Sequence, residues 1–185
     1  MTGNIVLLGL AAGTSDAGLA ESTGFAFAGY AAGVLLGATV ARHTERPLRA
    51  GLPVQFALLS GFTAVWEITS ARPAGALRWT DLVLASTAMG MQSSLVMSLG
   101  MPRLSTTYMT STLTRLLFGA VGGHGRTHVD WAAASRLLAL GTGAVLAALL
   151  VGTAASVAPA LSLTGVAAAW LSVWVMPAHE RRPHG

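Results

Sequence analysis

Cysteine and lysine are absent from the chain, and charged residues make up only 10% of its 185 residues. Without cysteine the protein can form no disulfides, iron–sulfur clusters or thiolate metal sites. A soluble domain carries about a quarter charged residues, so this chain is poor in charge for that class. All 11 basic residues are arginines, and they lie in short gaps between apolar runs rather than on one helix face. This placement does not indicate nucleic-acid binding.

Apolar residues, by contrast, are abundant and make up 53% of the chain. They form long runs without charge, and a membrane-spanning helix needs about 20 such residues. A soluble helical core could contain one run of this length, but not several. The pattern therefore predicts an all-α, polytopic membrane protein with spans at about 22–41, 51–71, 82–101, 134–154 and 158–176.

Two further segments, 1–13 and 104–122, are too short or too polar to be assigned as spans. Arginine placement decides between two topologies for 104–122, because cytoplasmic loops carry the excess of positive charge. If this segment is re-entrant, most loop arginines lie on one side of the membrane. If it crosses, that asymmetry disappears. We therefore expect a re-entrant 104–122 and a cytoplasmic C-terminus in a multi-pass membrane protein.

The chain also carries signs of an internal duplication. A shift of about 108 positions lays Met1-Thr2 on Met109-Thr110 and aligns the spans that follow. With a re-entrant segment in place, the halves 1–80 and 81–178 are inverted relative to each other. The first half then lacks the span that opens the second. We expect the natural protein to begin about 27 residues upstream, with Met1 an internal methionine.

Several ordered motifs carry a resemblance to a known family. They are Met1-Thr2-Gly3-Asn4, Phe27-Ala28-Gly29-Tyr30-Ala31-Ala32-Gly33, Met89-Gly90-Met91-Gln92-Ser93, and the threonine-rich run 106–114. In these motifs the chain resembles the YoaK-like family of bacterial membrane proteins, a domain of unknown function. The resemblance implies a multi-spanning inner-membrane protein with a helix ahead of the Met-Thr-Gly-Asn element. It implies little about activity.

Polar side chains inside the apolar segments are the candidates for solute binding. Hydroxyl groups in 104–122 recur at helical spacing i, i+3, i+4, i+7 and share one face, with an arginine at its edge. Such a stripe could line a polar cavity, or the hydroxyls could hydrogen-bond their own helix while the arginine reaches the interface. These residues are Thr107, Thr110, Ser111, Thr114 and Arg115.

The start of the chain and the third span supply the other candidates. Thr2 and Gly3 lie in a predicted turn, where glycine supplies unusual backbone angles, and Asn4 either caps the next helix or contacts a solute. The amide of Gln92 needs a partner at a helix interface or in a cavity. We expect Asn4, Gln92, Thr110 and Arg115 to face shared space.

Small residues spaced by four predict close helix packing rather than a dedicated dimer interface, although a homo-oligomer stays open. They are Gly29, Gly33 and Gly37 in the first long span, and Ala144, Ala148 and Gly152 in its repeat partner. Glu67 is an acid within a span, shallow enough to be an interfacial anchor. His124 and His128 have a metal-ligand spacing, but no acidic or thiol partner lies nearby in the sequence, so we expect no metal site.

Taken together, the residues favour one integral membrane domain over 1–178 and a short tail at 179–185. Inverted halves with broken segments are typical of secondary transporters, so we expect a small-molecule permease in the lipid bilayer. The alternative is a non-transporting membrane scaffold or accessory subunit. We expect no enzyme and no cofactor, because no paired acids, zinc motif or serine–histidine–aspartate set lies at membrane depth.

Overall fold

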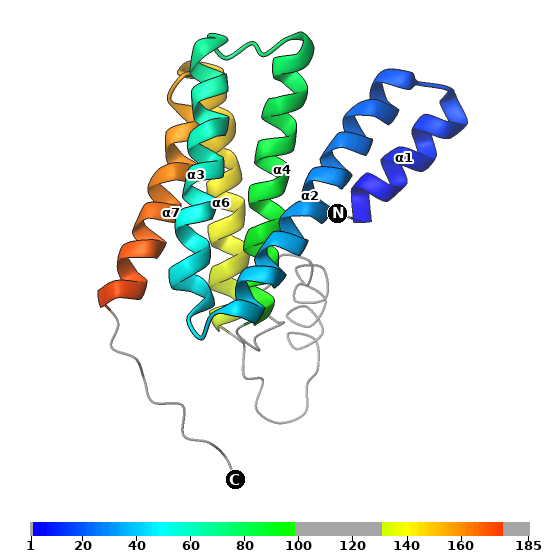
Figure 1. Cartoon of the computed structure of the whole chain (residues 1–185). Helices are drawn as coiled ribbons and strands as arrows, with labels where there is room; N and C mark the ends of the chain where they lie inside the picture. The colour runs from blue at the N-terminus through cyan, green and yellow to red at the C-terminus, as the bar shows by residue number, and fades with distance from the viewer. Residues whose placement is uncertain (1, 99–130, 176–185) are drawn as a thin grey trace, which may run out of the picture.

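The computed structural model describes residues 2–98 and 131–175, and within these ranges the chain is helical and contains no strand (Figure 1). In chain order the described helices are α1 (Thr2–Thr14), α2 (Ala17–His43), α3 (Pro47–Ile68), α4 (Gly75–Ser98), α6 (Trp131–Thr153) and α7 (Ala158–Val175). Of these, α2, α3 and α7 are long and apolar enough to cross a membrane. The predicted all-α fold with membrane-length helices is confirmed.

Each of the five predicted spans coincides with one described helix, although the ends differ by a few residues. The largest difference is at α4, which begins at Gly75 rather than at 82. The sequence boundary was placed after the charged residues Arg78 and Asp81. A helix runs through such residues as long as its backbone hydrogen bonds are kept.

The start of the chain differs from expectation. The turn predicted at Gly3-Asn4 is wrong, because both residues lie inside α1. Glycine costs a helix only about 1 kcal/mol relative to alanine, so the apolar run that follows can extend the helix back through it. With 13 residues, α1 is about 20 Å long and too short to cross a bilayer. It turns back onto α2 at Ser15, and the Asp16 carboxylate caps α2 by accepting a 3.0 Å hydrogen bond from the Leu19 amide.

Helix directions agree with two inverted halves. As Figure 1 shows, α2 descends and α6 ascends, while α3 ascends and α7 descends. The α2–α3 connection at 44–46 lies at the lower end, and the α6–α7 connection at 154–157 lies at the upper end. Each helix of the first pair is therefore antiparallel to its counterpart about 108 positions later, as an axis in the membrane plane requires.

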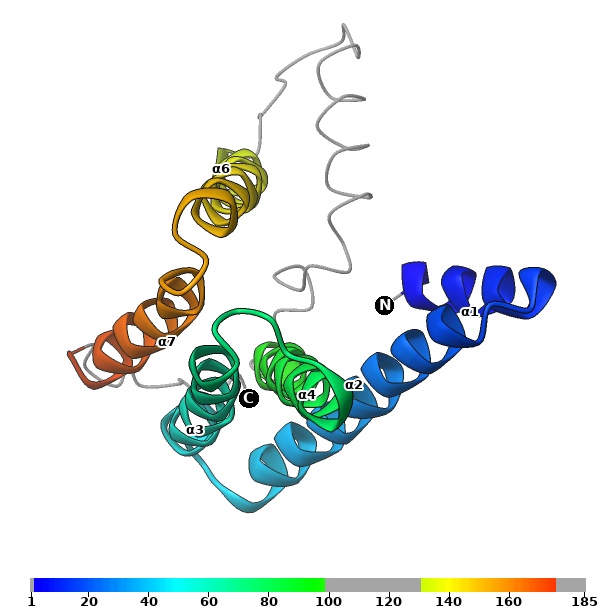
Figure 2. The same ribbon diagram turned by 90° about the horizontal axis from the view of Figure 1, so that it is seen from above.

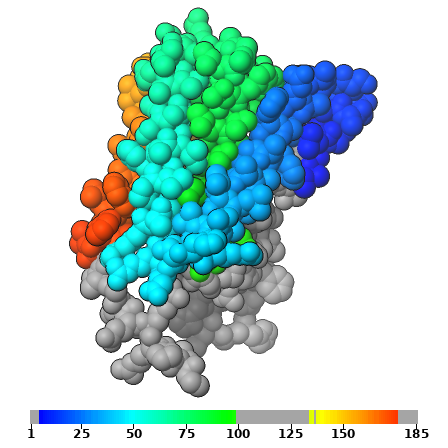
Figure 3. All heavy atoms as spheres, in the orientation of Figure 1, coloured from blue at the N-terminus to red at the C-terminus, as the bar shows by residue number. Residues whose placement is uncertain are grey.

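The core of the described structure lies around α4, which packs against both α2 and α3, while α3 packs in turn against α7 (Figure 2). The side chains of Met91 and Leu95 on α4 are the largest that are fully buried. By contrast, α1 extends to one side of the molecule and packs on α2 (Figures 1 and 3). The packed unit that can hold a site is thus built from α2, α3, α4 and α7.

The crossing of α2 and α4 brings the two backbones into contact. A Cβ atom built on Gly33 would collide with the carbonyl group of Thr87, and one built on Gly90 would collide with the carbonyl of Tyr30. Gly29 and Gly37 lie against the same helix, above and below this point. Small residues allow such approach between membrane helices. The glycine spacing of α2 therefore serves packing within this chain.

The small residues of α6 have different surroundings. Ala144, Ala148 and Gly152 are exposed, and a Cβ built on Gly152 would meet no atom within 4 Å. Among the described residues, no helix packs on this face. The two halves therefore agree in the inverted directions of their helices, but within the described residues the close glycine contact of α2 has no counterpart at α6.

Candidate functional site

Tryptophan and arginine side chains pair at both ends of the helices. At the upper end, the Arg78 guanidinium lies 5.0 Å from the centroid of the Trp79 ring, and Phe25 stacks on that ring at 4.9 Å. At the lower end, the Arg49 guanidinium lies 4.8 Å from the centroid of a Trp174 ring. Such amphipathic rings concentrate at membrane–water interfaces. The two pairs therefore mark the levels between which the apolar segments run.

Two long-range hydrogen bonds join α3 to α7 and to the connection that precedes α7. Near the upper end, the indole N–H of Trp66 donates to the carbonyl of Ala155 at 2.8 Å. Near the lower end, Nη2 of Arg49 donates to the carbonyl of Val173 at 3.3 Å. The bond of Trp66 joins the end of α3 to the connection just before α7, and the bond of Arg49 joins the start of α3 to the end of α7. The antiparallel pair is thus fastened at both ends, and a cavity lies between them.

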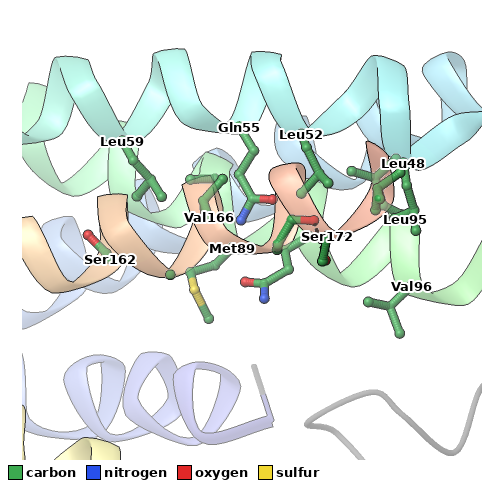
Figure 4. Close-up of a pocket in the computed structure, with 15 residues that line it drawn as sticks. Leu48, Leu52, Gln55, Leu59, Met89, Leu95, Val96, Ser162, Val166 and Ser172 are labelled. Atoms are coloured by element: carbon green, nitrogen blue, oxygen red, sulfur yellow. Dashed lines mark hydrogen bonds between the residues drawn. The ribbon is translucent and has the colours of Figure 1, made fainter. Parts of the chain in front are cut away.

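This cavity is a groove of about 590 Å³ between α3, α4 and α7 (Figure 4). Its size falls within the range of small-molecule pockets. None of its described lining residues is charged. They are Leu48, Leu52, Gln55 and Leu59 from α3; Ala88, Met89, Gln92, Leu95 and Val96 from α4; and Ser162, Gly165, Val166, Ala169, Ser172 and Val173 from α7.

Two glutamines supply the polar chemistry of the groove. Gln55 is only 3% exposed, and in Figure 4 its amide points away from α3 toward α7. Gln92 on α4 is exposed. Because Gly51 of α3 lies against Leu95 of the antiparallel α4, the two amides lie at similar heights. Within the described residues neither amide side chain makes a hydrogen bond.

The serines of the groove are less available. The Ser162 hydroxyl donates to the carbonyl of Pro159 at 2.6 Å, and the Ser172 hydroxyl donates to that of Ala169 at 2.7 Å. Both bonds stay within α7, so they use the hydroxyl hydrogens locally. The free donors and acceptors of this site therefore come mainly from the two amides.

The predicted solute-binding residues are only partly brought together. Gln92 lines the groove, whereas Thr2, Gly3 and Asn4 belong to α1, a helix that packs on α2 and whose described side chains do not line the groove. The remaining candidates lie outside the described residues, as do the two histidines; they are Thr107, Thr110, Ser111, Thr114, Arg115, His124 and His128. Glu67 is exposed beside Trp66, near the end of α3.

Gln55 and Asp81 are buried polar residues that the sequence analysis did not single out. Gln55 shares a helix face with Leu52 and Leu59, and this spacing could have shown that an amide lies on the packed side of α3. Asp81 is 6% exposed, and its Oδ1 has no hydrogen-bonding partner among the described residues. It was missed because it lies one residue before the predicted span. No group of three or more metal-ligating side chains occurs in the described part of the chain.

Residues 1–175 match the family model described as "Protein of unknown function (DUF1275)". The chain belongs to the DUF1275 family. The match covers every described helix of this DUF1275 protein, and with it all residues of the groove. No curated protein and no solved structure gives a match.

Proposed function

We propose that this DUF1275 protein is a small-molecule permease of the bacterial plasma membrane, with the groove between α3, α4 and α7 as its solute site. The observation that carries the proposal is the placement, in an apolar cavity of about 590 Å³, of two amides that make no hydrogen bond within the described residues. A polar group at membrane depth costs free energy unless it finds a partner. A site that leaves two amides free is suited to a ligand that supplies those partners.

The depth of the groove supports this proposal. From Arg49 to Trp66 the helix α3 rises by about 25 Å, which is close to the thickness of the hydrocarbon core. Gln55 lies about 9 Å above Arg49 on the same scale. The amide is therefore well inside the apolar layer. Solute sites of transporters with inverted halves lie in this region, between helices of the two halves.

Arginine placement supports an orientation. Arg42 in the last turn of α2 and Arg46 in the α2–α3 connection are close in sequence to Arg49, at the end of the molecule where the described part of α7 stops. Positive loops face the cytoplasm, so in the proposal this end and the C-terminal tail are cytoplasmic. The proposed protein needs no cofactor and catalyses no reaction; its partners are the bilayer and the solute.

Flux through purified protein in liposomes tests the proposal. Vesicles with the full chain should release a panel of small uncharged solutes faster than empty vesicles, and Gln55→Leu should lower that rate while leaving the unfolding temperature near its original value. Leu35→Ala, at a side chain that is 68% exposed on α2, is the control and should not change the rate. Equal release from vesicles with and without protein across the panel would contradict a permease.

One observation favours the alternative of a non-transporting scaffold. Along α6 the large side chains Leu138, Val145, Leu146 and Leu149 are between 56% and 69% exposed, so this helix could pack against another protein. Because the chain has no cysteine, a Leu146→Cys variant gives a clean disulfide test of self-association in native membranes. A crosslinked dimer without solute flux would favour the scaffold over the permease.

A further inference from the structure

Building on the proposed permease, we infer that the groove binds a neutral amphiphile, with an apolar tail and an uncharged head that both donates and accepts hydrogen bonds. A primary amide is one head of this kind. The inference assigns a ligand class to the groove between α3, α4 and α7, and it depends on the chemistry of a few lining residues.

The first argument is the absence of charge. Among the described residues, no Asp, Glu, Lys, Arg or His lines the groove. A carboxylate or ammonium group that entered it would lose its hydration without gaining a counter-charge, which is costly in an apolar surrounding. Charged solutes are therefore disfavoured by the described walls of the site.

The second argument is the kind of polar group that remains. The hydroxyls of Ser162 and Ser172 already donate to carbonyls of α7, at 2.6 Å and 2.7 Å. The amides of Gln55 and Gln92 make no hydrogen bond within the described chain. Each amide offers donors and an acceptor. A ligand head that donates and accepts can pair with both the NH₂ group and the carbonyl oxygen of a glutamine amide. A head that only accepts leaves the carbonyl oxygen of the amide without a donor.

The third argument is the way into the site. Met89 is 50% exposed, and Gln92 and Ser172 are exposed as well, so the groove is open along its side. These residues belong to α4 and α7, between the two interfacial levels marked by tryptophan and arginine pairs. A ligand that partitions into the bilayer can reach such an opening without crossing water. An amphiphile meets this condition, and a strongly hydrated solute does not.

Protection of a single cysteine tests the inference, and the cysteine-free chain provides the background. Ser172→Cys places a thiol on the wall of the groove, and Leu171→Cys places one at the same depth on a side chain that is 63% exposed and does not line it. The reaction of each full-length variant with N-ethylmaleimide is followed at pH 8.5 in nanodiscs. The probes are decanamide and, with the same chain length but an anionic head, decanoate.

Decanamide should slow modification of the Ser172→Cys variant in a saturable way and leave the Leu171→Cys variant unaffected, while decanoate should protect neither. Adding Gln92→Leu, at an exposed position where folding is insensitive, should raise the half-protecting concentration about fivefold, the effect of one hydrogen bond. Equal protection by both probes, protection by neither, or an unchanged half-protecting concentration in the Gln92→Leu variant would overturn the inference.

Protection without vesicle flux would contradict transport but not the ligand class. Flux without protection would contradict the ligand class alone.

Discussion

Single residues decide how closely the helices approach, and Gly33 is the clearest case. A methyl group at this position would meet the backbone of Thr87, which cannot rotate away as a side chain can. We expect Gly33→Ala to destabilise the protein by about 1–3 kcal/mol, the usual cost of overpacking. The measurement is thermal unfolding in detergent. Gly24→Ala on the same helix meets no atom within 4 Å, and it should keep or raise the unfolding temperature. Equal losses of stability in both variants would show that α2 and α4 are not in backbone contact at Gly33.

For Asp81 we predict a substitution that does not lower stability and can raise it. Its carboxylate is buried, and Oδ1 has no partner within the described residues. An unpaired buried charge is destabilising. Asp81→Asn removes the charge and keeps the shape, so the unfolding temperature should stay the same or rise. Asp16→Asn is the control, because asparagine caps a helix as well as aspartate does. A clear loss of stability in Asp81→Asn alone would mean that the carboxylate has an ionic partner.

At the scale of helices, the hydrogen bond between Trp66 and the connection before α7 predicts that two tryptophan substitutions differ in their cost to stability. Trp66→Phe removes the hydrogen bond to the Ala155 carbonyl, and we expect a loss of about 1 kcal/mol in the free energy of unfolding. Trp79→Phe keeps an aromatic ring beside Phe25 and removes no hydrogen bond of the described chain, so its loss should be smaller. Chemical denaturation of both variants measures the difference. A larger loss in Trp79→Phe would contradict the fastening role.

The positions of the helices could be read from the sequence because membrane spans are set by apolar length, a property of each segment alone. The start of α4 and the helical state of Gly3 were less accessible, since boundaries depend on caps and contacts as well as hydropathy. Gln92 was recognised as an amide at membrane depth, but Gln55 and Asp81 were not. Their burial depends on which faces of α3 and α4 meet neighbours, and a single sequence does not fix that pairing.

For the whole molecule, orientation is the property to test. The connection at 44–46 and the one at 69–74 lie at opposite ends (Figure 1). With positive loops inside, an impermeant thiol reagent should label Ala74→Cys in intact cells and Glu45→Cys only after permeabilisation. Both positions are exposed, so access to the thiol is not limiting. Labelling of Glu45→Cys alone in intact cells would show the reverse orientation.

The contacts of the glycines also have a consequence for variation among related sequences. Gly33 and Gly90 oppose backbone atoms of the other helix, so no substitution elsewhere can make room for a side chain there. Gly51 instead opposes the side chain of Leu95, which a smaller residue could replace. Across the family we therefore expect positions 33 and 90 to be invariant. At positions 51 and 95 we expect covariation, with a larger side chain at 51 accompanied by a smaller one at 95. An alignment in which alanine at 33 is common would contradict this expectation.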